Sequence, residues 1–77
     1  MKTSFKKFFG VSFEFNNKAW ELSDKIRTIA NKHNIRDTGS GAGFGMRDLD
    51  FEITEESDVK SFKKEVKKLK IKKLSFY

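Results

Sequence analysis

The chain has 77 residues, no cysteine and a net charge of +6. A chain of this length forms one domain with a small core, and without cysteine it has no disulfide or thiolate metal site to brace it. No apolar run reaches the roughly 18 residues that cross a bilayer, and the apolar run at 8–13 is too broken for a secretory signal. We therefore expect one compact cytoplasmic domain over residues 1–77, without a membrane partner.

The first half of the chain predicts a strand followed by a helix. Residues 11–15 alternate between apolar and polar side chains, as in a half-buried strand. From residue 18 to residue 33 the apolar side chains recur at steps of three and four, which is the spacing of a helix that packs on one side. Asn34 then suits the left-handed conformation that ends such a helix. Residues 1–10 are expected to add an edge strand or an arm that packs down through its phenylalanines, Phe5, Phe8 and Phe9.

The second half predicts two strands, a helix and a last strand. Residues 35–38 are a short second strand, and a glycine-rich stretch at 39–45 is a hairpin connection to a strand at 46–53. Thr54 can cap a second helix, whose apolar side chains again step by three and four. Residues 72–77 form the closing strand.

The order strand, helix, strand, strand, helix, strand predicts an α+β domain of the ferredoxin-like, split βαββαβ kind. In this fold two helices cover one face of a four-stranded antiparallel sheet, and the first and third strands are its central pair. The other face of the sheet is left open, so its outward side chains are candidates for binding.

Four carboxylates are predicted to share this open face. They come from the two central strands and are Glu14, Asp48, Asp50 and Glu52. Such a group can bind a basic protein partner or a divalent cation, or can serve only to keep the sheet face polar. The predicted outward positions of the central strands include no aromatic side chain, unlike RNA-recognition modules of this topology, which stack bases there. Phosphate would also be repelled by the negative charge.

The glycine-rich stretch has glycine at every second position from 39 to 45. Its spacing fits neither a P-loop nor a dinucleotide fingerprint. Alternate glycines leave one face of a hairpin bare, so a partner can approach the backbone closely. We expect Gly41, Gly43 and Phe44 to contribute to a protein-binding surface; a flexible or bulged hairpin without a partner also explains the pattern.

The surplus positive charge is confined to one segment. Residues 58–73 hold eight lysines and two acidic residues. The resulting charge of +6 equals the net charge of the whole chain. A localised surplus can dock on the phosphates of a nucleic acid without reading its sequence, or can be an ordinary solvated helix face. The candidate nucleic-acid-binding residues are Lys60, Lys63, Lys64, Lys67, Lys68 and Lys70.

Catalysis has little support in these residues. There is no thiol nucleophile, and the only imidazole, His33, falls at a predicted helix end. We therefore expect a protein that is not an enzyme and that has neither cofactor nor catalytic or metal site.

Three functions remain. The first is a small inhibitor or adaptor that grips a protein, or a protein–nucleic-acid complex, with the acidic face and the glycine hairpin. In its size, lack of cysteine and charge layout the chain resembles phage-encoded anti-defence proteins, anti-CRISPR proteins included, which would place it in the cytoplasm of the host cell. The second is a nucleic-acid-binding module that uses the lysine-rich helix. The third is a homodimer or other homo-oligomer with a structural role.

Overall fold

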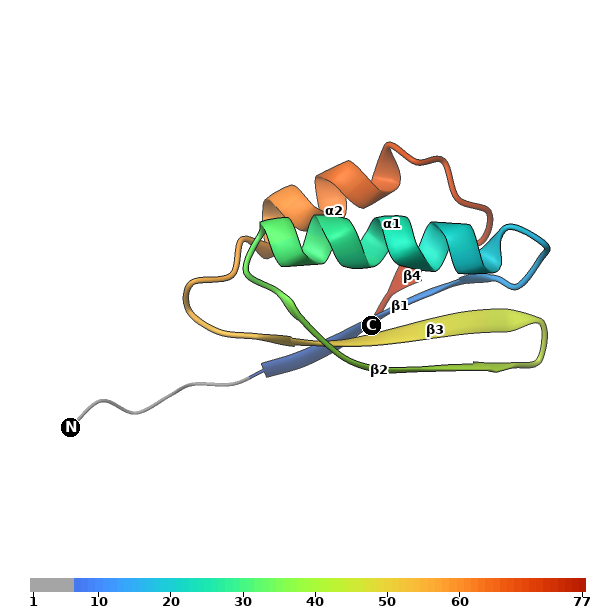
Figure 1. Cartoon of the computed structure of the whole chain (residues 1–77), viewed down its shortest axis with the longest axis horizontal. Coiled ribbons are helices and arrows are strands. Elements are labelled where there is room, and N and C mark those ends of the chain that lie inside the picture. The colour runs from blue at the N-terminus through green and yellow to red at the C-terminus, as the bar shows by residue number, and fades with distance from the viewer. Residues whose placement is uncertain (1–6) are drawn as a thin grey trace.

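A computed structural model describes residues 7–77. The strands are β1 (Lys7–Glu14), β2 (Arg36–Gly43), β3 (Met46–Ile53) and β4 (Ser75–Phe76), and the helices are α1 (Ala19–Lys32) and α2 (Val59–Lys67). The four strands form an antiparallel sheet in the order β2-β3-β1-β4, and both helices lie on the same face of it (Figure 1). This confirms the predicted α+β, ferredoxin-like fold. Within the described residues, neither helix has the length and hydropathy needed to cross a membrane.

The core lies between the sheet and the helices and consists largely of aromatic and branched side chains. Phe62 of α2 stands edge-on to both Phe9 and Phe51, with ring centroids 5.6 and 5.5 Å away. Such pairs add about 0.5–1.5 kcal/mol each to the free energy of burying the rings. The buried apolar side chains are Val11, Phe13, Ala19, Ile26, Ala30, Ile35, Leu49, Phe51, Phe62 and Val66.

β1 begins earlier than predicted. Lys7–Gly10 is the first half of this central strand, paired with β3 from Lys7 opposite Ile53 onward, so the prediction of a separate edge strand or arm over residues 1–10 is wrong for these four residues. The inward alternation of Phe9, Val11 and Phe13 continues through Gly10, which points to the other face. Residues 1–6, including Phe5, lie outside the described part of the chain.

The glycine-rich stretch is mostly strand. β2 stays paired with β3 to its end at Gly43, with one irregularity between Asp37 and Gly39, and only Phe44 and Gly45 form the turn. Both turn residues have positive φ, 54° and 75°, as in the two-residue turns whose twist matches a hairpin. β2 is a strand despite its low strand propensity because the regular strand β3 offers it a full set of backbone hydrogen-bond partners.

The second helix starts later than predicted. Thr54 caps a turn instead, since its Oγ1 accepts a hydrogen bond from the backbone of Glu56 at 3.3 Å. The N-cap of α2 is Asp58, whose carboxylate accepts a hydrogen bond from the backbone N–H of Ser61 at 3.0 Å. The hydrogen bonds that Asp58 receives from the backbone and the side chain of Ser61 lower the pKa of Asp58. The expected left-handed Asn34 is confirmed, with φ of 61°.

A charge cluster joins the two helices at one end. Lys32 Nζ lies 2.7 Å from one carboxylate oxygen of Glu65, and His33 Nε2 contacts the other. The hydrogen bond from Lys32, followed by that from His33, lowers the pKa of Glu65. His33 is the C-cap of α1, so the imidazole has the structural position that the sequence predicts for it.

Candidate binding surface on the open sheet face

The sheet face without helices, called the open face below, combines residues of three kinds. Strand parity brings to it the carboxylates of β3, the glycines of β2 and an aromatic side chain from the start of β1. The register partners on this face are Phe8 with Glu52, Gly10 with Asp50, Ser12 with Asp48, Arg36 with Glu52, Gly39 with Asp50 and Gly41 with Asp48.

The four predicted carboxylates do not form a single cluster. Successive outward positions on a strand are about 6.6 Å apart, so Asp48, Asp50 and Glu52 are spread along β3. Glu52 is only 8% exposed, and Glu14 at the far end of β1 faces Met46. Within residues 7–77 no group of three or more acidic or histidine side chains is placed to hold a metal ion. The accessible negative charge of the open face is therefore centred on Asp48 and Asp50.

Tyr77 lies across the open face. Its backbone pairs with Gly10 in both directions, at 2.8 and 2.9 Å, and so prolongs β4 by one residue. Its ring occupies the space that a side chain at position 10 would need, and its hydroxyl donates a hydrogen bond to Asp50 Oδ1 at 3.1 Å. Burial of the hydroxyl, together with this hydrogen bond and the charges of Asp50 and Asp48, raises the pKa of Tyr77 to about 12.

Among residues 7–77 the open face has two exposed aromatic rings. Phe8 lies on the central strand β1, so the prediction that the outward positions of the central strands carry no aromatic side chain is wrong, whereas Tyr77 follows β4. Phe8 is 70% exposed and Tyr77 is 60% exposed. With Phe9, Thr38 and Asp50 they line a shallow pocket of about 420 Å³. Phe8 is missed from the sequence because the first strand is predicted to begin at residue 11. Tyr77 is missed because only the outward positions of the two central strands are considered, whereas Tyr77 follows β4 and its ring crosses Gly10 toward Asp50.

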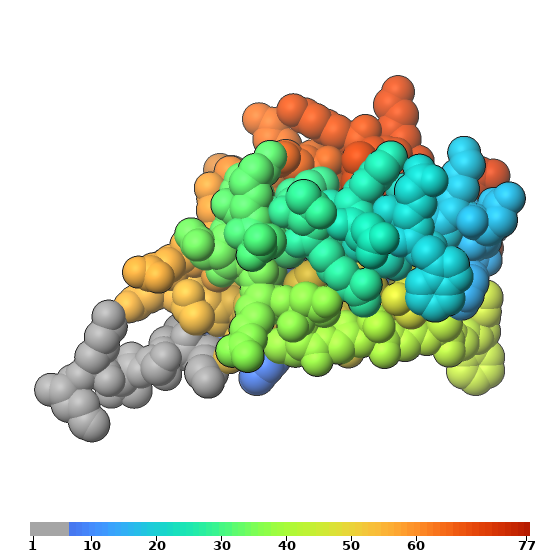
Figure 2. All heavy atoms as spheres, in the orientation of Figure 1, coloured from blue at the N-terminus to red at the C-terminus, as the bar shows by residue number. Residues whose placement is uncertain are grey.

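The glycines of β2 form a bare strip beside the carboxylates. A Cβ atom added at Gly41 or Gly43 would have no heavy atom within 4 Å, and one at Gly39 would meet only Asp50 Oδ2 at 3.8 Å. β2 is also an edge strand and is exposed along nearly its whole length, as its yellow-green band at the surface shows (Figure 2). The structure therefore pairs the predicted Gly41 with Asp48 and the predicted Gly43 with Met46, and it is Gly39 that lies opposite Asp50.

The hairpin tip carries a separate aromatic group. Phe44 is fully exposed in a left-handed conformation, which costs a bulky residue roughly 1–2 kcal/mol. Phe15 donates its backbone N–H to Gly45 and packs edge-on against Trp20, which is 61% exposed. Phe44 thus belongs to the end of the hairpin and not to the open face.

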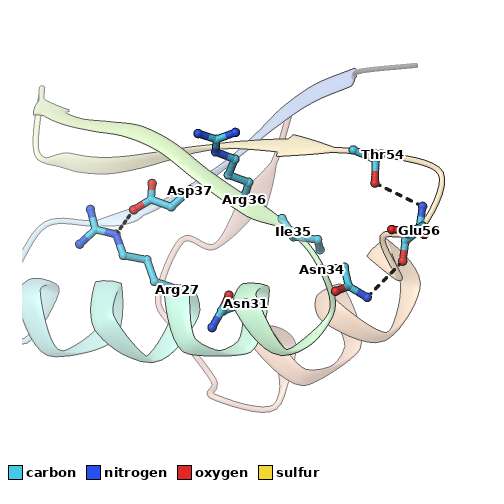
Figure 3. A pocket seen from close by; sticks show the side chains of 8 residues that line it. All are labelled: Arg27, Asn31, Asn34, Ile35, Arg36, Asp37, Thr54 and Glu56. Carbon is cyan, nitrogen blue, oxygen red and sulfur yellow. Dashed lines mark hydrogen bonds and ion pairs between the residues drawn. The ribbon is translucent and has the colours of Figure 1, made fainter. Parts of the chain in front are cut away.

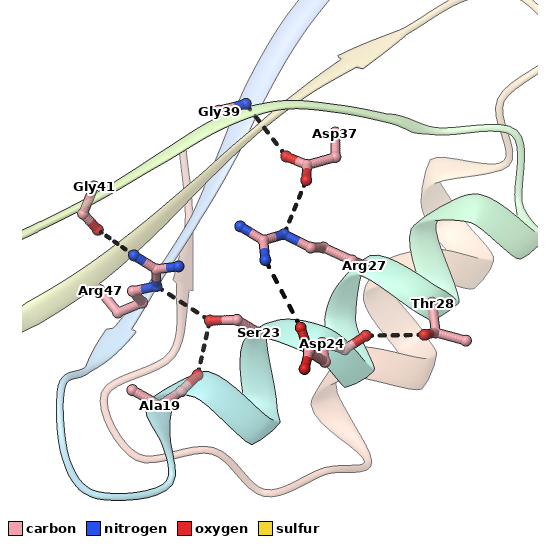
Figure 4. A network of polar contacts seen from close by, with 9 residues as sticks. All are labelled: Ala19, Ser23, Asp24, Arg27, Thr28, Asp37, Gly39, Gly41 and Arg47. Atoms are coloured by element: carbon pink, nitrogen blue, oxygen red, sulfur yellow. Dashed lines mark hydrogen bonds and ion pairs between the residues drawn. The ribbon is translucent and has the colours of Figure 1, made fainter.

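Arg47 supports this aromatic group from the helix side of the sheet, as its parity predicts. It is 5% exposed, and its guanidinium carbon lies 4.5 Å from the centre of the Trp20 ring. Its Nε donates to Ser23 Oγ at 3.1 Å (Figure 4). A second bond, from Nη1 to the backbone oxygen of Gly41, measures 3.5 Å. The buried cation is therefore held by neutral acceptors and a π face, and it links α1 to the hairpin.

The lysines of α2 and the following turn lie in the helix layer, on the other side of the sheet from the open face. Lys63 is half-buried, with its Nζ 5.3 Å from the centre of the Phe76 ring, whereas the other five candidates are exposed. In the part of the chain that is described, those five form no ion pair. A neighbouring groove of about 580 Å³ is lined by Lys18, Lys25, Lys70 and Lys72, together with Glu14 and Glu21.

A further pocket of about 430 Å³ lies between the end of α1, the start of β2 and the turn before α2 (Figure 3). Arg27 on its wall forms an ion pair with Asp37 at 2.9 Å, and Asn34 donates to the backbone oxygen of Glu56 at 3.5 Å. These contacts join the elements around the pocket. Cationic, anionic and amide groups are mixed in its lining, which does not favour one class of ligand.

Comparison with known proteins finds no protein-family model, no curated protein and no solved structure that matches this chain. The fold assignment accordingly rests on strand order and helix placement. Among the surfaces described above, the open face combines exposed aromatic rings, accessible carboxylates and a bare glycine strip.

Proposed function

We propose that this chain is a binding protein, not an enzyme, and that it holds a protein partner on its open face. The observation that carries the proposal is the combination of two exposed aromatic rings, Phe8 and Tyr77, with a side-chain-free glycine strip. Exposed tyrosine is a frequent energetic centre of protein interfaces, and bare glycines let a partner's backbone approach the sheet. Asp48 and Asp50 add a negative charge that selects a basic partner.

The same charges argue against nucleic acid on this face, because carboxylates repel phosphates. The only imidazole in the chain is engaged by Glu65, which argues against a role as a catalytic base. We also propose, from the likeness in size and charge layout to phage-encoded anti-defence proteins, that the partner is a host protein or protein–nucleic-acid complex in the cytoplasm, which the chain inhibits.

Gly41→Val tests the open face without removing any contact. The new side chain enters open space, and valine is a better strand residue than glycine, so stability should be unchanged or up to about 1 kcal/mol higher. Ser40→Val is the matched control, since Ser40 is paired with Leu49 and so points to the other side of the strand. The measurement is the amount of each host protein retained by tagged variants after nuclease treatment.

The proposal predicts that Gly41→Val loses the retained partner and that Ser40→Val keeps it. Asp48→Lys with Asp50→Lys should also abolish retention while the circular dichroism spectrum stays that of the folded chain. Equal retention by Gly41→Val and the unmodified chain would show that the open face does not meet the partner.

A second candidate function is nucleic-acid binding by the exposed lysines of α2. It is favoured by one observation, the absence of ion pairs at Lys60, Lys64, Lys67, Lys68 and Lys70 among the described residues. Contacts of this kind give an affinity that falls as the salt concentration rises. The logarithm of the affinity falls with the logarithm of the salt concentration with a slope of about 0.9 for each phosphate contacted. Lys64→Glu with Lys67→Glu should abolish a gel shift by DNA or RNA; a shift that survives both changes would remove this candidate.

A further inference from the structure

We infer that the pocket formed by Phe8, Tyr77 and Asp50 receives an arginine side chain of the partner. The inference rests on the proposed function and identifies the chemistry that the open face recognises. It follows from three properties of the pocket: its rings are exposed, its carboxylate can still accept hydrogen bonds, and the strand beside it is bare.

Both rings are available for stacking. Among the ring contacts of residues 7–77, neither Phe8 nor Tyr77 packs against another aromatic side chain. Both are largely exposed, yet they line one pocket together. The electron-rich faces of such rings attract a cation, and the negative charge of the Asp50 carboxylate adds to that attraction.

The carboxylate of Asp50 is held in place and still has acceptor capacity. Its Oδ1 accepts the hydroxyl of Tyr77 at 3.1 Å, which orients both groups. Its Oδ2 lies on the side of Gly39, 3.8 Å from the position that a Cβ atom at residue 39 would occupy, and glycine leaves that position empty. A donor that enters the pocket can therefore reach Oδ2 without displacing the tyrosine.

These features select a cation and, among cations, a guanidinium. An anion would be repelled by Asp50 and Asp48, and a neutral apolar group would remove water from Asp50 without giving it a donor. A guanidinium is planar, so it can stack on a ring and direct N–H groups to a carboxylate at the same time. An ammonium group attracts the same carboxylate but has no flat face to stack.

The bare strip of β2 suggests how the partner's chain runs. Gly39 is paired with Asp50 and Gly41 with Asp48, so the two accessible carboxylates are about 6.6 Å apart along the sheet. Alternate side chains of an extended peptide have the same spacing. A segment lying over the glycines can thus place one arginine in the pocket and a second basic residue, two positions away, at Asp48. The partner's motif is Arg-x-Arg or Arg-x-Lys.

The test uses a fluorescently labelled peptide with two arginines separated by one glycine and flanked by glycines, titrated with the full chain by anisotropy. Matched peptides carry lysine or citrulline in place of arginine. Citrulline keeps the planar shape of arginine but lacks its charge. The arginine peptide should bind several-fold more tightly than the lysine peptide, and the citrulline peptide should not bind. Affinity should fall with salt.

Variants of the chain locate the binding to the pocket. Phe8→Ala and Tyr77→Ala should each weaken binding about two- to fivefold, as expected for exposed cation–π contacts. Asp50→Asn should weaken it by a similar factor. Tyr77→Phe keeps the ring but loses the hydroxyl that orients Asp50, so it should weaken binding no more than Tyr77→Ala does. Phe44→Ala, which is at the hairpin tip, should leave the affinity unchanged.

Equal binding of the arginine and citrulline peptides, equal binding of the arginine and lysine peptides, or full affinity in Phe8→Ala and Tyr77→Ala would each overturn the inference. A concentration-dependent dimer that is lost in both Phe8→Ala and Tyr77→Ala would also overturn it, because the pocket would then serve a second copy of the chain. If the peptides fail to bind while Gly41→Val still loses the partner, the inference fails and the proposed function stands. If both results are negative, both fail.

Discussion

Gly10→Ala is expected to change the titration of Tyr77 far more than the stability of the fold. The space beside Gly10 is occupied by the end of the Tyr77 ring, so a methyl group there has to displace the ring from the sheet. The ring is an exposed, terminal part of a flexible side chain, and it can move outward at little cost. The lost ring contact is offset by the better strand propensity of alanine, so the free energy of unfolding should change by no more than about 1 kcal/mol.

The size of the effect on Tyr77 follows from the causes of its high pKa. Burial of the hydroxyl, the hydrogen bond to Asp50 and the charges of Asp50 and Asp48 together raise the pKa from 10.0 to about 12. Lifting the ring exposes the hydroxyl and breaks the hydrogen bond. The pKa in Gly10→Ala should therefore fall most of the way back to 10.0. Asp50→Asn should produce part of this fall, because burial remains.

The assay is the near-ultraviolet absorbance of the phenolate as pH is raised, with circular dichroism at each step to verify that the chain is folded. Tyr77 is the only tyrosine, so the titration needs no deconvolution. An unchanged pKa in Gly10→Ala would mean that the ring does not lie over Gly10 and would remove the geometry on which the arginine pocket depends. The raised pKa also implies that Tyr77 adds stability below pH 10 that is lost as pH rises toward 12. The unmodified chain should lose stability relative to Tyr77→Phe in that interval.

Two further substitutions probe the hairpin tip and the helix pair. Phe44→Asn should raise the free energy of unfolding by about 1 kcal/mol in chemical denaturation, because Asn-Gly suits a turn with two positive φ angles and the fully exposed ring is removed; a loss of stability would show that Phe44 packs within the chain. Glu65→Gln should lower stability at neutral pH and flatten its decline in acid. The folded pKa of Glu65 is held below its ordinary value of 4.5 by Lys32 and His33, so the stabilisation is present above pH 4.5 and is lost as pH falls through the lowered pKa. An unchanged acid profile in Glu65→Gln would contradict this assignment.

The order of elements could be predicted because hydrophobic periodicity reports on burial directly. The three- and four-residue steps of both helices and the two-residue alternation of β3 are unambiguous, and they determine the ferredoxin-like topology. β2 was harder to predict, since its eight residues contain alternate glycines that lower its own strand propensity. It is a strand because β3 offers it a full set of backbone partners, and local sequence carries no signal of that pairing.

The candidate site was only half predictable for a related reason. The parity of β3 correctly assigns Asp48 and Asp50 to the open face and Arg47 to the helix side. The position of Tyr77 depends on a backbone pair with Gly10, a residue 67 positions earlier, so no local pattern could place its ring beside Asp50. In the sequence Gly10 breaks the apolar run at 8–13, whereas in the fold it leaves the space that the Tyr77 ring fills.

The features of the open face and the hairpin tip share an energetic property that bears on function. The exposed ring of Phe8, the alternate glycines in a paired strand and the left-handed Phe44 each cost stability or add nothing to it within the described chain. A small domain has little stability to spare, and simple substitutions would remove each feature. Local choices that disagree with the rest of a well-packed fold are usually found where a protein meets something else. The core and the helix pair follow ordinary rules in this chain. The departures on the open face and at the hairpin turn involve aromatic rings and glycines, whereas those elsewhere are lysines: Lys70 and Lys73 have positive φ, and Lys18 begins α1 without a side-chain cap.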